Sequence, residues 1–428
     1  MNKIFDFDIY KLNKLRASSL ISFFLAASML LYSLRGKVGA AAISALMLLL
    51  SIGLLNIKRK GCPNGNRVAF IFLICFAFAF NILRSLSPQY YLIVGYLVTP
   101  IILLDTNILN YNRFWKWLRI IAIIEATGVY TQRFFPQLYF LLMKQIMPGN
   151  VMESLVIRQM NGYYTGFTRE VSYTMLFIVV GLGLYIYKFN DLDKKKRIIS
   201  IIYLLVSLFL SGKKATLVFF VFAFFIVQFI LSNSKLKILK YISIAVIAIF
   251  LIAILYPIWG NMTIFSRMNE LIHNISIRDY TAMTSGRTRI YEHAISLWET
   301  NKWFGIGWGN FKYSVPSKFW YSGFDVHNCL LQVLCETGII GLLFYVIVNI
   351  YCFINSIRAV YICKKHNKNM FNLSVFCCFF ELFFFLYSMT EPILYEYPDY
   401  VLFFVCFSCS NILSNKKIEK NHWRDNNE

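Results

Sequence analysis

Long apolar runs alternate with short polar connections along this chain, and this alternation restricts the possible folds more than any other feature. The runs cover roughly residues 17–34, 38–56, 68–83, 89–104, 118–132, 171–187, 198–211, 215–232, 241–258, 328–355, 371–388 and 399–412. Charged residues make up only 15% of the chain, against about 25% in soluble proteins. Since a membrane-crossing helix needs about 20 apolar residues, we predict an all-α polytopic membrane protein with about 12 transmembrane helices and exclude a water-soluble globule.

Lysine and arginine are concentrated in the N-terminal segment, in every second connection and in the C-terminal tail. Examples are the clusters at 58–60, 194–197 and 364–368. Because Lys and Arg accumulate on the cytoplasmic side of a membrane, we predict that both termini are cytoplasmic. The same pattern accounts for the net charge of +22 without a nucleic-acid partner. The connection before the last run is acidic, with Glu391, Glu396 and Asp399.

We treat residues 1–428 as a single membrane domain with two long external loops, 133–170 and 259–326. Long loops on a rigid scaffold commonly carry function. In the second loop we expect a helix over 286–299 that Ser285 caps. Its apolar face would hold Ile290, Ala294, Leu297 and Trp298, and a turn with Gly305, Gly307 and Gly309 would follow. The long tenth run either projects beyond the bilayer or kinks.

One histidine stands where the second loop re-enters the membrane, in the dipeptide His327-Asn328. Imidazole titrates near neutral pH, so His327 is a candidate to accept a proton from a hydroxyl group. The alternative is a polar pair that caps the tenth span. His273 repeats the dipeptide without its context, and His293 fits packing or solvent contact on the loop helix better.

Several cations on the external side are candidates for binding phosphate. Arg287 and Arg289 open the loop helix, whose N-terminus favours anions, and guanidinium binds phosphate oxygens bidentately. The other cations are Lys213 and Lys214 in the tight turn between the seventh and eighth runs, and Arg158 and Arg169 in the first long loop, where Glu170 follows Arg169. The alternatives are anchoring to lipid headgroups and snorkelling.

Two carboxylates, Glu125 and Glu381, lie inside predicted spans. Carboxylates within a membrane are candidates for function, and a structural pairing is the alternative. No cluster of His, Cys and Asp has the spacing of a metal site, so we expect neither a metal ion nor another cofactor.

Several short motifs together resemble the O-antigen polymerase/ligase superfamily. They are Ser285-Gly286-Arg287, Trp298, Phe304-Gly305-Ile306-Gly307, His327-Asn328, and the segment Leu331-Gln332-Val333-Leu334-Cys335-Glu336-Thr337-Gly338-Ile339-Ile340-Gly341-Leu342. Residues 166–170 and 210–215 are similar to two further family regions. Val171 replaces the usual proline in the first region, and Lys214 replaces the usual arginine in the second. Lysine offers a point charge where arginine would offer a bidentate contact.

The resemblance implies a membrane glycosyltransferase of GT-C-like architecture that takes glycans from undecaprenyl diphosphate and transfers them to a hydroxyl, with inversion and without a metal. It assigns catalysis to His327 and diphosphate binding to Lys214 and Arg287, and Arg169, Arg158 and Arg289 are further candidates. Glu170, Asn328 and Lys213 are additional candidates near the site.

Within this superfamily we favour an O-antigen polymerase, which extends a lipid-linked repeat unit. The first alternative is a ligase that transfers the glycan to lipid A–core, and the second is a membrane transporter or flippase. The expected location is the bacterial inner membrane, with the active site on the periplasmic side. Expected partners are the lipid-linked donor and acceptor, the lipid bilayer, and possible proteins of the same pathway, namely a chain-length regulator and a flippase.

Overall fold

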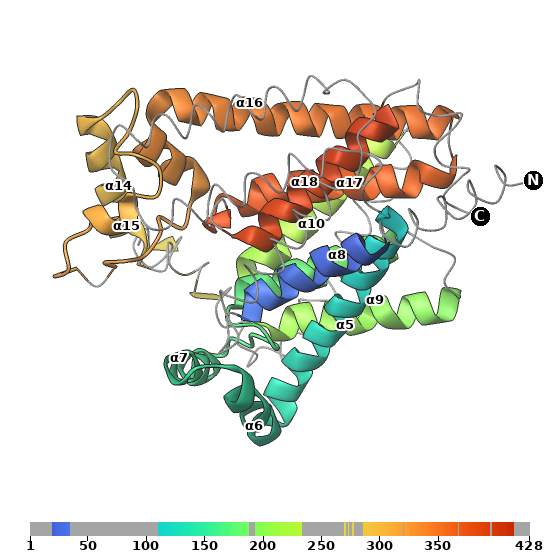
Figure 1. The fold of residues 1–428 in the computed structure, drawn as a ribbon, viewed down its shortest axis with the longest axis horizontal. Helices are drawn as coiled ribbons and strands as arrows, with labels where there is room; N and C mark the ends of the chain where they lie inside the picture. The colour runs from blue at the N-terminus through green and yellow to red at the C-terminus, as the bar shows by residue number, and fades with distance from the viewer. Residues whose placement is uncertain are drawn as a thin grey trace, which may run out of the picture.

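The computed structural model describes residues 19–34, 110–187, 193–232, 269–270, 273, 276–277, 286–319, 321–366, 368–393 and 396–414. This part of the chain is predominantly helical and contains no strand. The helices are Ser19–Leu34 (blue in Figure 1), α5 Tyr111–Phe134, α6 Pro136–Ile146, α7 Gly149–Met160, α8 Val171–Ile186, α9 Lys194–Leu210, α10 Lys214–Leu231, α14 Thr288–Thr300, α15 Phe311–Ser314, α16 Cys329–His366, α17 Lys368–Tyr387 and α18 Tyr397–Ser414. The prediction of an all-α fold is therefore confirmed.

The predicted spans coincide with helices wherever the structure describes them. Three helices are long and apolar enough to cross a membrane, namely α10, α16 and residues Met370–Tyr387 of α17. Ser19–Leu34 and α8 are shorter apolar helices. The predicted spans at 38–56, 68–83, 89–104 and 241–258 lie outside the described residues. The protein is an all-α integral membrane protein, and the total of about 12 spans stays a prediction.

The core is formed by α8, α17 and α18, which lie close together beneath the long helix α16 in Figure 1. Both α8 and α18 are buried on nearly every face. Large aromatic side chains fill the space between the helices, among them Trp115 of α5 and Phe376 of α17, whose ring centroids are 5.2 Å apart. Aromatic side chains remove a large apolar area from contact with solvent, and Phe376 also lies against Gly183 of α8, so this packing holds α8 between α5 and α17.

A buried carboxylate ties the turn before α8 to α5. Glu125 accepts hydrogen bonds from the backbone N–H of Phe167 at 3.1 Å and from the Thr174 hydroxyl at 3.2 Å. Gly166 has a φ of 60°, and a Cβ there would lie 2.8 Å from the Glu125 carbonyl oxygen. On α17, Glu381 accepts a hydrogen bond from Ser410 of α18 at 3.3 Å. These contacts favour the structural interpretation of both carboxylates.

The second long loop contains the expected helix, α14, with Arg287 at its N-cap position. Ile290 and Ala294 are buried as predicted, and they pack with Phe311 of α15 and Cys335 of α16 in a small hydrophobic cluster. The proposed cap Ser285 lies outside the described residues. The loop helix is thus docked on the first turns of α16.

The long helix α16 kinks at Gly338, where φ is 69° and ψ is −169°. The glycine turn packs against this kink: the N–H groups of Ile306 and Gly307 donate to the carbonyls of Cys335 and Glu336 at 3.0 and 2.8 Å. The Glu336 carboxylate accepts hydrogen bonds from the backbone N–H groups of Gly309, at 2.9 Å, and Phe311, at 3.1 Å. The turn expected at Gly305–Gly309 is therefore confirmed. Of the two alternatives for the long apolar run at 328–355, the structure shows the kink.

Candidate active site

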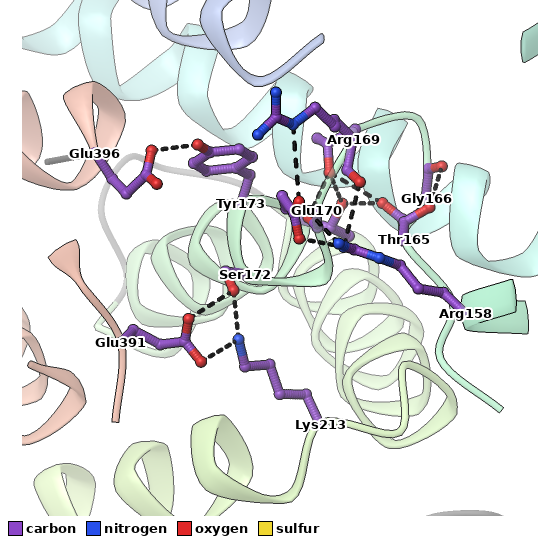
Figure 2. A network of polar contacts seen from close by, with 12 residues as sticks. Arg158, Thr165, Gly166, Arg169, Glu170, Ser172, Tyr173, Lys213, Glu391 and Glu396 are labelled. Carbon is purple, nitrogen blue, oxygen red and sulfur yellow. Dashed lines mark hydrogen bonds and ion pairs between the residues drawn. The ribbon is translucent and has the colours of Figure 1, made fainter. Parts of the chain in front are cut away.

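The short loop between α17 and α18 is where several candidate side chains meet. The Nζ atom of Lys213, in the turn between α9 and α10, lies 2.8 Å from Oε1 of Glu391. Ser172, in the first turn of α8, donates to Oε2 of Glu391 at 3.1 Å and also contacts Nζ of Lys213 (Figure 2). The ends of α8, α10 and α17 therefore meet on one side of the bundle, as the predicted alternation of spans requires.

Arg287 reaches the same loop from α14. Its Nη1 donates to the carbonyl oxygen of Thr390 at 2.8 Å. Arg287 also interacts electrostatically with Lys214, at the start of α10, and with Tyr291 one turn further along α14. Burial raises the pKa of Tyr291, although the charge of Arg287 opposes this shift. Two cations thus lie close together, and the guanidinium has further N–H donors for an anion.

His327 lies beside this loop, in the two residues before α16. The backbone N–H of Cys329 donates to the Ser388 carbonyl at 2.8 Å, which fixes the start of α16 against the end of α17. His327 has a φ of 56° and is the one non-glycine residue with positive φ in the described part of the chain. Its Nδ1 atom is buried and has no hydrogen-bond partner among the described residues. Strained backbone at a polar residue is typical of functional sites.

The electrostatics favour a neutral imidazole next to an ionised carboxylate. Burial lowers the pKa of His327, and the positive charge of Arg287 lowers it further, against the opposing charges of Glu391 and Asp325. Burial would raise the pKa of Glu391, but the charges of Lys213 and Arg287 outweigh it and bring that pKa below its usual value. At neutral pH His327 therefore has a free nitrogen lone pair with which to accept a proton.

The cations of the first long loop form a separate group on the other side of the first turn of α8 (Figure 2). Arg158 of α7 makes a bidentate ion pair with Glu170, with Nη2 2.8 Å from Oε1. Arg169 Nε lies 3.7 Å from the same carboxylate. Glu170 thus pairs directly with both arginines. Among the described residues, Arg287 and Lys214 make no such direct ion pair, although Glu391 attracts Arg287 and Glu270 attracts Lys214 electrostatically.

The remaining candidates are not brought into the cluster. Arg289 is exposed on α14 and makes no ion pair with the described residues. Asn328 caps α16, since its Oδ1 accepts the N–H of Leu331 at 3.1 Å. His273 is exposed, and His293 packs against the rings of Phe311 and Tyr321.

Sequence reasoning did not place Ser172, Thr390 or Glu391 at the site. Glu391 was noticed only as part of an acidic external connection. One signal in the sequence pointed to Glu391. It lies in a short connection on the same predicted side of the membrane as the Lys213-Lys214 pair, whose charge needs a partner. Only the packing of α8 and α10 against α17 shows that these segments touch.

The fold and this cluster define a class: an all-α integral membrane protein whose helix ends hold a histidine next to several cations. Residues 199–346 match the model of a family described as O-antigen ligase. This match, which covers about a third of the chain, agrees with the resemblance to the O-antigen polymerase/ligase superfamily that the motifs indicate. Members are membrane glycosyltransferase-like enzymes that act on lipid-linked glycans. No match was found among curated proteins.

The matched segment runs from α9 into α16. It contains Lys213, Lys214, Arg287 and His327 but not Glu391. The family model thus covers the cations and the histidine, and the carboxylate comes from outside it.

Proposed function

We propose that this protein is a polysaccharide polymerase that transfers a growing glycan from undecaprenyl diphosphate to a terminal sugar hydroxyl of another lipid-linked repeat unit. The observation that carries the proposal is the convergence of Arg287, Lys214 and His327 around the α17–α18 loop, within the segment that matches the family. This arrangement supplies a base and an anion site without any other group.

In this mechanism His327 accepts the proton of the acceptor hydroxyl while the hydroxyl oxygen attacks the anomeric carbon. The bond between that carbon and the diphosphate oxygen breaks, and the electron pair leaves with undecaprenyl diphosphate. Attack from the face opposite the leaving group inverts the anomeric centre. The lowered pKa of His327 supports this role, because the imidazole is ready to accept a proton at neutral pH.

Negative charge grows on the leaving diphosphate, and fixed cations stabilise it in the transition state. Arg287 and Lys214 are assigned this role. Lys213 is assigned to Glu391, whose carboxylate already pairs with it. The site faces the periplasm of the inner membrane in this proposal, in agreement with the distribution of basic connections.

A ligase that transfers the finished glycan to lipid A–core is the second candidate. The observation that favours it is the description of the matched family as O-antigen ligase. The two reactions use the same donor and the same type of chemistry, and they differ in the acceptor.

The experiment that tests the proposal is a gel of surface lipopolysaccharide from a deletion strain. The strain is complemented with the parent gene, with His327→Ala, or with His273→Ala as a control at an exposed histidine of the same loop. Membrane immunoblots verify equal protein levels. We expect a core that carries one repeat unit in the deletion strain, with the ladder restored by the parent and by His273→Ala but not by His327→Ala.

Other outcomes would overturn parts of the proposal. A bare core, with long glycan accumulating on the lipid carrier, would identify a ligase. A normal ladder with His327→Ala would remove the assignment of the base. An unchanged ladder in the deletion strain would exclude polymerisation of this glycan.

A further inference from the structure

Helix α6 exposes a wide apolar face. Its exposed apolar side chains, together with those of the two residues before it, are Phe134, Phe135, Leu138, Leu141, Leu142 and Ile146. At about 100° per residue the four of them that lie within α6, from Leu138 to Ile146, fall within an arc of about 140°. Leu141 is 65% exposed. A face of this size on a described helix requires an explanation.

The other faces of α6 have different partners. Tyr139 and Met143 are buried in a cluster with Leu155 of α7, and the Tyr139 hydroxyl donates to the Gly166 carbonyl at 2.7 Å. This contact fixes the inner face on the turn before α8. Lys144 and Gln137 are exposed on a third, polar face. The helix thus has a packed sector, a polar sector and an exposed apolar sector, within which Gln145 is the one exposed polar residue.

The exposed apolar face continues onto neighbouring elements. On α5, a predicted span, Ile120 and Ile124 are exposed along the stripe that leads to Phe134. On α7, Ile157 and Met160 near its C-terminal end are also exposed. Since exposed apolar side chains of a spanning helix contact lipid, the stripe on α5 extends a lipid-facing surface onto α6. In Figure 1, α6 and α7 lie beyond the end of α5, away from α14 and α15.

We propose that α6 and the C-terminal end of α7 insert their exposed apolar face into the lipid of the outer leaflet, so that this pair of helices anchors the first long loop in the membrane. The charge at the edge of the face agrees with this position, because Lys144 lies on the polar sector, from which its amine can reach the lipid headgroups. The occupant of the face is therefore the bilayer itself.

The insertion has a structural consequence for the site. Arg158 lies on the last turns of α7 and is tied to Glu170 at the head of α8. An anchored α7 holds this ion pair at the membrane surface, next to the cluster around Lys213 (Figure 2). The inference does not depend on which glycan the protein transfers.

The test uses the full-length protein in phospholipid vesicles, with the photo-crosslinking residue p-benzoylphenylalanine at Leu141. A matched variant carries it at Lys144, one turn away on the polar face of the same helix. Both variants are compared with the parent by thermal unfolding, and Leu138 is the replacement position if the Leu141 variant does not fold. Adducts are identified by mass spectrometry.

We expect phospholipid acyl-chain adducts at Leu141 in several-fold excess over those at Lys144. Equal or absent lipid adducts at Leu141 would overturn the proposal. Crosslinks from Leu141 to protein, either to a second copy or within the same chain, would also overturn it, because they would identify a protein partner for this face.

Discussion

The glycine at the kink of α16 allows a prediction whose size follows from the structure. Gly338 has a φ of 69° and a ψ of −169°, a region that is essentially restricted to glycine. A Cβ at this position would lie 2.2 Å from both the carbonyl carbon and the carbonyl oxygen of Trp303. Both are backbone atoms, so a change of rotamer does not relieve the clash.

Gly338→Ala therefore combines backbone strain with forced separation of two segments. The strain costs about 1–3 kcal/mol. The backbone of Trp303 must retreat by roughly 1.2 Å to reach the shortest ordinary contact distance. That movement breaks the hydrogen bonds from Ile339 N–H to the Lys302 carbonyl, at 2.9 Å, and from Ile340 N–H to the Trp303 carbonyl, at 3.4 Å. With about 1 kcal/mol for each bond, we expect a total loss of about 3–5 kcal/mol.

Two alanine controls separate the contributions. Gly323 also has a positive φ, 80°, but a Cβ there meets nothing within 4 Å, so Gly323→Ala reports backbone strain alone. Gly149 has neither constraint and serves as the neutral control. The measurement is the thermal unfolding midpoint of each purified variant in detergent, with glycan transfer as the second readout.

The expected order of stability is Gly149→Ala equal to the parent, Gly323→Ala slightly lower, and Gly338→Ala far lower or not recoverable as folded protein. Activity should fall with Gly338→Ala, because the segment that leads from α14 to the kink positions Arg287. If Gly338→Ala is as stable as Gly323→Ala, then the close approach to Trp303 does not restrain the fold and the reasoning is refuted.

Three further predictions concern the site. The acid limb of kcat/KM should lie below pH 6.5, because burial and the charge of Arg287 lower the pKa of His327, so that activity is lost only as the pH falls through that lowered value; a pH profile with a limb at or above 6.5 would contradict the base assignment. Glu391→Gln leaves Lys213, whose side chain is only 13% exposed, without its counter-charge and should cost about 3 kcal/mol of stability, measured by thermal unfolding; failure of Lys213→Met to restore part of it in the double variant would count against the pair. Glu336→Gln removes the charge of the carboxylate that accepts two backbone N–H groups, and it should lower the free energy of unfolding by about 2 kcal/mol. Proteolysis of the glycine turn at the same rate as in the parent would argue against this role.

The sequence was sufficient for the fold class and for part of the site. Apolar runs predict helices because a membrane requires backbone hydrogen bonds to be satisfied within each segment. The same local logic located the loop helix with Ile290 and Ala294 on its inner face. His327, Arg287 and Lys214 were found because they stand at segment ends whose motifs resemble a family.

Other features are invisible in local patterns. The pairing of Lys213 with Glu391 joins residues far apart in the chain, and their contact depends on how α10 packs against α17. The position of α7 beside the head of α8 likewise pairs Arg158 with Glu170. Arg158 and Arg287 are the same type of residue, but only Arg158 is held in a direct ion pair with a carboxylate.

Apolar periodicity and charge asymmetry, which act within one segment at a time, determined that this chain forms membrane helices and which side chains stand at their ends. The tertiary structure alone decided which of those ends meet, because close packing of distant helices determines which charges neutralise each other and which are left for a substrate. The lowered pKa of His327 belongs to this second group, since it depends on burial and on the charge of Arg287, supplied by another segment of the chain.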